Sequence, residues 1–310
     1  MTDDDDRFEF SADQDQPPTD DGAVTTPTSP APYSIVVSTT FHPAFAFRDL
    51  LPDAIFLSSD ALYFFVHRAH LLASSTNNFA YLFVQQLSFP NSSTTPPVFL
   101  VSEHSALMDV VLHAIYGMSC AELNPSLSTL LDAISALDAY GTLHRVLTPS
   151  SPLCLLILTE APRDPLQVYA VAARHRLDHL AVAVSAKLHS IQLADVPAAA
   201  ALAMGPIYLK RLFLLHYRRV EYLKLLLNTA PETHVETLAC GFVQQTDLQT
   251  AWSLATGSLM WDARPDLSIG RLRWTLASLL DKLECEQCKT ALSIKIRQMV
   301  LNWCEAKATI

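Results

Sequence analysis

The pattern of apolar and polar positions is clearest between residues 52 and 83, where it predicts two short strands and a helix. Residues 54–57 form an apolar run, and residues 62–66 form a second run rich in aromatic and β-branched side chains. The connection between them is short and holds turn-forming serine and aspartate, so we expect an antiparallel hairpin. After His67 the apolar period changes from two residues to about four. The residues that would share one helical face are Leu71, Ser75, Phe79 and Phe83.

The next elements also follow from this pattern. A third strand is predicted at residues 98–101, after a loop of serine, threonine and proline at 91–97. A helix that ends at Gly117 follows, and Ser102 or Ser105 could cap its start. Another helix is expected from Ser126 to Tyr140, closed by Gly141, and residues 143–158 should complete a helical cluster.

The second half of the chain is predicted to be helical. Residues 164–190 are typical of a helix pair that begins with Asp164 as N-cap and Pro165 at the first helical position. Residues 208–227 predict a longer helix whose end is apolar nearly all round, which indicates burial. In residues 229–310 the four tryptophans lie in short helical patterns separated by glycine and proline, so we expect a small helical region there.

Three motifs in the first half carry a resemblance to a known family. An aspartate opens the first strand, the second strand ends in an aromatic-x-Val-His-Arg string, and the helix after it carries Leu-x-x-x-Ser. This pattern resembles the opening of a BTB/POZ domain, although the aromatic that closes the family's helix pattern comes one residue late, at Phe79. The matching residues are Asp53, Phe64, Val66, His67, Arg68, Leu71 and Ser75. Two later strings resemble helix ends of the same family, Ile115-Tyr116-Gly117 and Asp138-Ala139-Tyr140.

The resemblance implies an α+β fold in which a small sheet is capped by a helical cluster. It places the BTB/POZ domain at residues 45–160. Residues 161–228 would be a helical extension, because the Asp-Pro-Leu-x-Val-Tyr string there is similar to the segment after the BTB domain in many fungal proteins. Residues 229–310 remain as the small helical C-terminal region, and residues 1–33 as an acidic, proline-rich tail that we expect to be disordered.

The function that the resemblance implies is protein–protein interaction without catalysis. BTB domains typically homodimerise, and many recruit a cullin scaffold for ubiquitin transfer while others bind transcriptional corepressors. The expected partners are therefore a second copy of the chain and, beyond it, a cullin or a corepressor. The residues expected at the dimer interface are Asp53, Arg68, Leu71, Leu72, Ser75 and Phe79. The residues expected to support the core are His67, Phe64, Tyr116 and Tyr140.

Charge and composition narrow the picture further. The net charge is −10, but residues 1–21 hold nine acidic side chains and one arginine, a net of −8, which leaves −2 for the rest. The nearly neutral remainder of the chain has no basic surface of the kind that binds nucleic acid, so we expect no nucleic-acid partner. The basic stretch at residues 210–219 is interpreted as a solvated helix face. The longest uncharged apolar run, residues 196–209, is shorter than the roughly 20 residues of a bilayer span. We therefore expect a soluble protein.

The N-terminus is acidic where a signal peptide needs basic residues, and the six cysteines are scattered. Both observations favour reduced thiols in the cytoplasm or the nucleus. No phosphate-binding loop, zinc-protease motif or nucleophile elbow occurs in the sequence, and His67 has no neighbouring nucleophile with a base. We therefore expect a protein that is not an enzyme and has no cofactor.

Cys285-x-x-Cys288 has the spacing of half a zinc site, but no second such pair exists in the sequence. We therefore expect no metal and interpret these residues as reduced cysteines of a helix. The candidate ligands are Cys240, Cys285 and Cys288, which His234 or Cys304 could complete only if the fold brings them together. The alternative function is accordingly a zinc-dependent protein, or a corepressor-binding scaffold, that uses these C-terminal cysteines.

Overall fold

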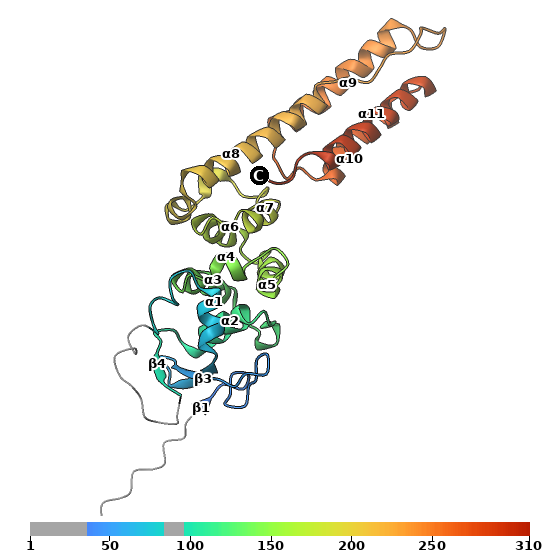
Figure 1. The fold of residues 1–310 in the computed structure, drawn as a ribbon. Coiled ribbons are helices and arrows are strands. Elements are labelled where there is room, and N and C mark those ends of the chain that lie inside the picture. The colour runs from blue at the N-terminus through green and yellow to red at the C-terminus, as the bar shows by residue number, and fades with distance from the viewer. Residues whose placement is uncertain (1–35, 84–95) are drawn as a thin grey trace, which may run out of the picture. The chain divides into compact units, whose positions relative to one another are not determined.

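The computed structural model describes residues 36–83 and 96–310. The tail predicted at residues 1–33 and most of the loop predicted at 91–97 lie outside these ranges. Within them the protein is a mixture of one small sheet and many helices, which agrees with the predicted α+β class (Figure 1).

Four short strands make the sheet. They are β1 (Val36–Val37), β2 (Ala54–Leu57), β3 (Leu62–Val66) and β4 (Val98–Leu100), in the order β1-β3-β2-β4. Strands β2 and β3 pair antiparallel, with Ile55 opposite Phe65, so the predicted hairpin is confirmed. The two outer strands run parallel to their neighbours. Strand β4 covers three of the four residues predicted for the third strand.

One face of this sheet packs against helices. Phe56, at the centre of β2, lies 5.6 Å from the ring of Phe79 and 6.3 Å from that of Phe99, and all three side chains are buried. Figure 1 shows the helices stacked on one side of the sheet. They are α1 (Arg68–Ser74), α2 (Ser105–Ile115), α3 (Leu127–Ala139), α4 (Leu143–Val146) and α5 (Pro152–Glu160). Between α2 and α3 lies a 3₁₀ turn, Ala121–Leu123.

The helix predicted from residue 68 to 83 is much shorter in the structure. It ends at Ser74, and residues 78–81 all have positive φ angles between 53° and 59°. The Ser75 hydroxyl explains the stop, because it accepts hydrogen bonds from the backbone amides of Asn77 and Phe79 and donates one to the carbonyl of Tyr140. A left-handed turn of non-glycine residues is unfavourable by itself, so these tertiary contacts must hold it.

The helices after the sheet domain extend the same core. Helices α6 (Pro165–Arg174) and α7 (Asp178–Ser185) form the predicted pair, and Asp164 accepts a hydrogen bond from the amide of Gln167 as the predicted N-cap. A 3₁₀ turn, Leu193–Asp195, leads to α8 (Ala198–Leu227). Helix α8 begins ten residues before the predicted start at 208 and is kinked at Gly205 and Pro206, where Gly205 has φ of 68°.

Helix α8 is shared by two hydrophobic cores. Its first part contributes Leu212 to the core that includes the sheet, and its last turns contribute Leu223 and Leu227 to a second core. The division expected at residue 228 therefore falls at the end of an element that both cores use. By length and composition α8 could also cross a membrane, but one such helix among the described residues is weak evidence for a span.

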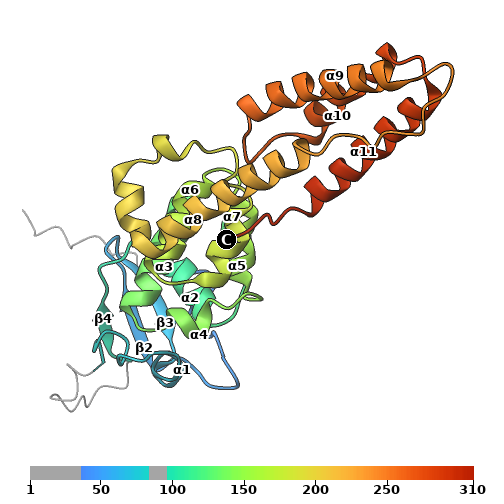
Figure 2. The same ribbon diagram turned by 90° about the horizontal axis from the view of Figure 1, so that it is seen from above.

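The second core is made by the C-terminal helices. They are α9 (Phe242–Trp261), α10 (Ile269–Ala277) and α11 (Glu286–Glu305), with a 3₁₀ turn at Leu280–Lys282 (Figure 2). Trp252 and Trp303 are buried in this core, and the indole N–H of Trp303 donates to the carbonyl of Leu267. Trp261 and Trp274 are exposed. The small helical region expected at residues 229–310 is therefore present, although it depends on the end of α8 for one wall.

Candidate functional sites

Two of the residues expected at a dimer interface lie in the core of their own chain. Leu71 and Phe79 have no exposed surface. Phe79 stacks on Tyr140 with ring centroids 4.2 Å apart, because the left-handed turn directs it inward. A partner could reach these two side chains only by opening the domain, so their assignment to the interface is corrected to a core role. Leu72 and Ser75 are half-buried, and Leu72 packs on the edge of the same core.

Asp53 and Arg68 contact each other in a different way from an ion pair. A side-chain oxygen of Asp53 accepts a hydrogen bond of 2.7 Å from the backbone amide of Arg68, the first residue of α1. The Arg68 guanidinium lies over the ring of Phe83, 5.3 Å from its centroid. Asp53, the residue before β2, thus stabilises the free N-terminus of α1.

The four residues expected to support the core are buried. Both the backbone amide and Nδ1 of His67 lie 2.9 Å from the Tyr116 hydroxyl, and its Nε2 lies 2.9 Å from the carbonyl of Leu50. Burial raises the pKa of Tyr116, so the phenol stays neutral. The structure thus places His67 in a closed structural network rather than in a catalytic arrangement.

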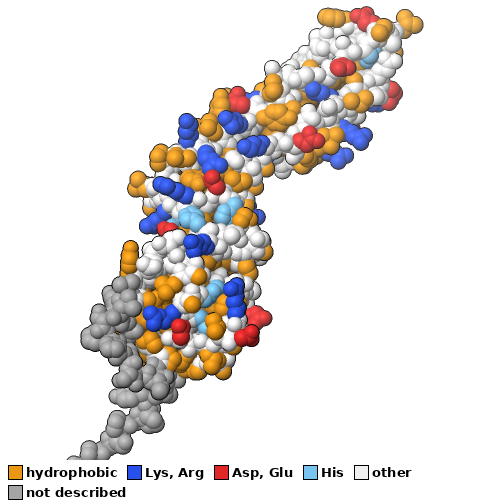
Figure 3. Space-filling model, viewed as in Figure 1, with side chains coloured by type: hydrophobic (Ala, Val, Ile, Leu, Met, Phe, Trp, Pro, Cys, Tyr) orange, Lys and Arg blue, Asp and Glu red, His pale blue; other side chains and the backbone are white. Residues whose placement is uncertain are grey.

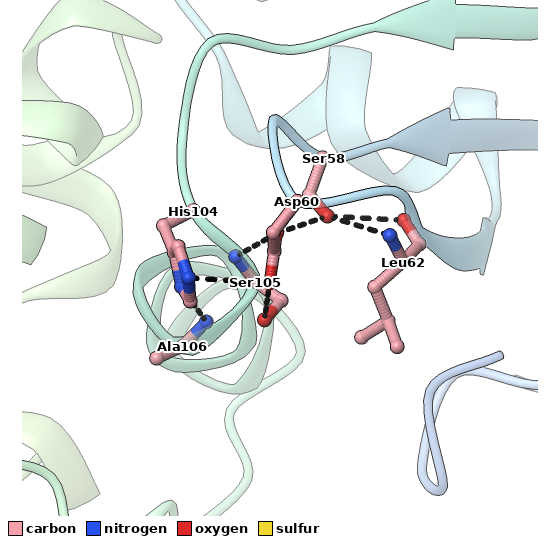
Figure 4. A network of polar contacts seen from close by, with 6 residues as sticks. All are labelled: Ser58, Asp60, Leu62, His104, Ser105 and Ala106. Atoms are coloured by element: carbon pink, nitrogen blue, oxygen red, sulfur yellow. Dashed lines mark hydrogen bonds and ion pairs between the residues drawn. The ribbon is translucent and has the colours of Figure 1, made fainter. Parts of the chain in front are cut away.

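A second polar network joins the β2–β3 turn to the start of α2 (Figure 4). One oxygen of Asp60 accepts hydrogen bonds from the Ser58 hydroxyl at 2.7 Å and the Ser105 amide at 2.8 Å, and the other accepts from the Ser105 hydroxyl at 2.6 Å. Neither Ser102 nor Ser105 caps α2 as expected, because His104 occupies the N-cap position and Asp60 takes the Ser105 amide. The sequence indicates only a turn at Asp60, because its partner Ser105 lies 45 residues away.

The basic stretch of α8 is engaged within the protein. Arg211 forms an ion pair of 2.7 Å with Asp178. Arg219 donates to the carbonyls of Pro265, Ala306 and Lys307, and its guanidinium lies 4.5 Å from the ring centroid of Trp303. These two arginines therefore make contacts within the protein, so the interpretation of this stretch as a solvated helix face is corrected for them, whereas Lys210 and Arg218 are exposed.

The fold does bring together the candidate metal ligands of the C-terminal region. His234 and Cys240 come from the loop between α8 and α9, whereas Cys285 is the N-cap of α11 and Cys288 lies in its first turn. One ligand atom from each of these four residues lies within 4.8 Å of all the others. Cys304, on the same helix α11, is exposed and is not part of the cluster. The expectation of separate helix cysteines is therefore corrected.

The atoms of this cluster are closely spaced. The sulfur atoms of Cys240 and Cys288 are 3.7 Å apart, and Nε2 of His234 lies 3.3 Å from the sulfur atoms of both Cys285 and Cys288. Cys240 and Cys288 are buried in the second core, whereas His234 and Cys285 are half-buried. The cluster therefore lies at the edge of this core, with one side open to the solvent.

The thiols of the cluster differ in acidity. Backbone amides at the start of α11, first that of Cys288, lower the pKa of Cys285 to about 7. Burial raises the pKa of the Cys288 thiol to about 12 and also raises that of Cys240. Three sulfur atoms and one imidazole nitrogen form a donor set that binds a soft or borderline cation. The three thiols also lie within 4.8 Å of one another, so a disulfide is an alternative use of the same groups.

Comparison with protein-family models, with curated proteins and with solved structures finds no match to this chain. The resemblance to BTB/POZ domains therefore depends on the sequence motifs and on a small sheet with a helical cap, and the family assignment stays a prediction. The Cys-x-x-Cys spacing identifies one half of the cluster in the sequence, although we expected no metal there. The other half, His234 and Cys240, had no local signal.

Proposed function

We propose that this chain is a non-catalytic protein-interaction module. In this proposal the BTB-like domain brings two copies together and recruits a partner such as a cullin or a corepressor, and the C-terminal helices bind a further protein. The α+β architecture with a sheet capped on one face is compatible with the BTB part of the proposal.

The observation that carries the proposal is the distribution of exposed apolar side chains. Among the described residues, 23 large apolar side chains are exposed. Of these, 15 lie between residues 198 and 310, although that segment makes up fewer than half of the described residues. Figure 3 shows hydrophobic side chains on the surface of the helices from α8 onward. Single exposed apolar side chains are ordinary on a protein surface, but apolar side chains aligned along one helix face are a candidate contact for a partner.

Helix α9 shows the pattern best. Val243, Leu254 and Trp261 are 65%, 73% and 95% exposed. They are separated by 11 and 7 residues, about three and two helical turns, so they lie along one side of the helix. The opposite side of α9 carries Leu248 and Trp252, which fill the second core. Val243, Leu254 and Trp261 therefore do not belong to the second core, and another protein could bind to them.

The homodimer is tested by the variant Leu72→Glu. Because Leu72 is half-buried on α1, a glutamate there should disrupt a dimer that uses this helix while the domain itself still folds. Light scattering coupled to size-exclusion chromatography should then give a dimer for the wild type and a monomer for the variant. The matched control is Leu155→Glu, on the exposed side of α5, which should remain dimeric. A variant at Leu72 that stays dimeric would remove α1 from the interface, and a monomeric wild type would refute homodimerisation.

The partners are tested by affinity purification of the full-length protein from its own cells followed by mass spectrometry. Stoichiometric recovery of a cullin would support an adaptor of a ubiquitin ligase, and recovery of a corepressor would support a transcriptional scaffold. The triple variant Val243→Ser, Leu254→Ser and Trp261→Ser should lose partners held by α9 and keep those held by the BTB-like domain. Recovery of an identical set of proteins with this variant would contradict the role of α9.

A further inference from the structure

The cluster of His234, Cys240, Cys285 and Cys288 has the dimensions of a tetrahedral metal site. A zinc ion at about 2.3 Å from sulfur and about 2.0 Å from nitrogen holds neighbouring ligand atoms roughly 3.5–3.8 Å apart. Three separations in the cluster, 3.7 Å between the sulfur atoms of Cys240 and Cys288 and 3.3 Å for each nitrogen–sulfur pair, are close to these values, and all four ligand atoms lie within 4.8 Å of one another. Small outward movements of the side chains would therefore admit the ion.

The histidine is already oriented as a metal ligand. Its Nδ1 lies 2.8 Å from the carbonyl oxygen of Val235, while Nε2 points toward the thiols. A proton on Nδ1 that is donated to this carbonyl leaves a lone pair on Nε2, which is the usual outer-shell arrangement of a metal-bound imidazole. The carbonyl of His234 also accepts a hydrogen bond from the Gln245 side chain, which fixes the loop against α9.

Two backbone segments position the three cysteines. Cys240 and Thr237 exchange both backbone hydrogen bonds, at 3.0 and 3.2 Å, so a tight antiparallel turn presents the Cys240 thiol. Cys285 and Cys288 are three residues apart at the start of α11, so their side chains share one side of the helix. Two structured segments thus meet at four donor atoms, although they are separated by about 45 residues of chain.

From this geometry we infer that His234, Cys240, Cys285 and Cys288 bind one zinc ion that stabilises the C-terminal helices. Four protein ligands complete a tetrahedral shell and leave no open position for substrate, so the site is structural rather than catalytic. Zinc binding displaces the thiol protons into the solvent and joins the loop at 229–241 to α11. This inference is independent of the proposed interaction function.

The position of the site explains what the ion does. Residues 229–241 connect α8 to α9 without a helix, and Val235 and Leu238 in this loop are 87% and 112% exposed. Apolar burial therefore contributes little to holding the loop tip. Coordination through His234 and Cys240 would replace it and fix the geometry at which α9 leaves the loop.

A disulfide is the competing use of the same thiols. The sulfur atoms of Cys240 and Cys288 are 3.7 Å apart, whereas a disulfide bond is about 2.05 Å long. A disulfide would also use only two of the three thiols and would leave the imidazole without a role. The zinc site uses all four groups.

The test measures metal in the full-length protein purified under reducing conditions from zinc-supplemented cells. Elemental mass spectrometry should give one zinc per chain for the wild type. The matched control is Cys304→Ser, because Cys304 lies on the same helix outside the cluster, and it should also retain one zinc per chain. Cys288→Ser should lose the ion. Cys285→Ser should weaken zinc affinity by about 100-fold or more, because the loss of a ligand costs more affinity than the loss of an outer-shell partner, which costs about 10–100-fold.

Two further measurements have a readout in the wild type itself. Replacement of zinc by Co²⁺ in the wild type should give the strong visible absorption of a tetrahedral thiolate site. Titration with a chelator should lower the thermal midpoint of the wild type and of Cys304→Ser, and leave that of Cys288→Ser, which holds no ion, nearly unchanged. A wild type that retains no zinc and takes up no Co²⁺ would overturn the inference. A Cys240–Cys288 disulfide in the native protein, or a zinc affinity of Cys285→Ser equal to that of the wild type, would overturn it as well.

Discussion

The junction between the left-handed turn and the end of α3 gives the sharpest prediction for stability. Gly141 has φ of 67°, and a Cβ atom built on it would lie 2.7 Å from Oδ1 of Asn77 and 2.9 Å from Oγ1 of Thr76. Gly117 has nearly the same φ, 70°, but nothing lies within 4 Å of its Cβ position. The variants Gly141→Ala and Gly117→Ala therefore share the backbone strain and differ in the steric clash.

The size of the difference follows from the hydrogen bonds around Asn77. An alanine in the left-handed region costs about 1–2 kcal/mol at either position. At Gly141 the methyl group must also displace the Asn77 side chain, which donates to the carbonyl of Ala139 at 2.8 Å and accepts from the amide of Ala80 at 2.9 Å. Two hydrogen bonds at about 1 kcal/mol each give an additional loss of roughly 2 kcal/mol for Gly141→Ala.

The assay is equilibrium unfolding in urea together with thermal unfolding. Gly141→Ala should unfold about 2 kcal/mol more easily than Gly117→Ala, which corresponds to a thermal midpoint lower by roughly 4–8 °C for a domain of about 200 residues. Equal stability of the two variants would show that Asn77 moves at no cost. It would refute the argument that this junction fixes the left-handed turn.

Two further substitutions test single contacts. Burial alone would raise the pKa of Asp60, but the hydrogen bonds from Ser105 and Ser58 outweigh it and lower the pKa to about 2. The carboxylate therefore contributes stability above its unfolded pKa of about 4 and loses it as the pH falls toward 2. Asp60→Ala should cost about 1 kcal/mol in urea unfolding at pH 7 and progressively less below pH 4; a cost that does not change with pH would contradict this. Tyr169→Phe should cost about 1 kcal/mol, because the buried hydroxyl donates to the carbonyl of Tyr208 at 2.9 Å, whereas the exposed Tyr217→Phe should be neutral.

The sequence predicts the elements whose signals are local. The hairpin at residues 54–66 is recognisable from its two apolar runs and the turn between them, and α3 from its apolar face and from Gly141 after its end. The start of α6 follows from Asp164 and Pro165 in the same way. Each of these signals lies within a few residues of the element that it specifies.

The elements that the sequence does not predict depend on distant partners. The end of α1 is set by the Ser75 hydroxyl, which donates to the carbonyl of Tyr140 across 65 residues of chain. The apolar period continued past this point and wrongly extended the helix to Phe83. In the same way, His234 gives no local sign that it lies beside Cys285, 51 residues later. Side-chain contacts of this range become visible only when the fold is known.

The shared helix α8 has a consequence for how this protein could be divided. A chain cut after residue 228 would keep α8 but uncover Leu223 and Leu227, which are fully buried in the second core. A chain that starts at residue 229 would instead lack one wall of that core. Neither fragment keeps its apolar surface covered, so both should aggregate or unfold where the whole chain is stable. The two cores are therefore expected to fold and unfold as one unit, and neither should be stable when it is expressed alone.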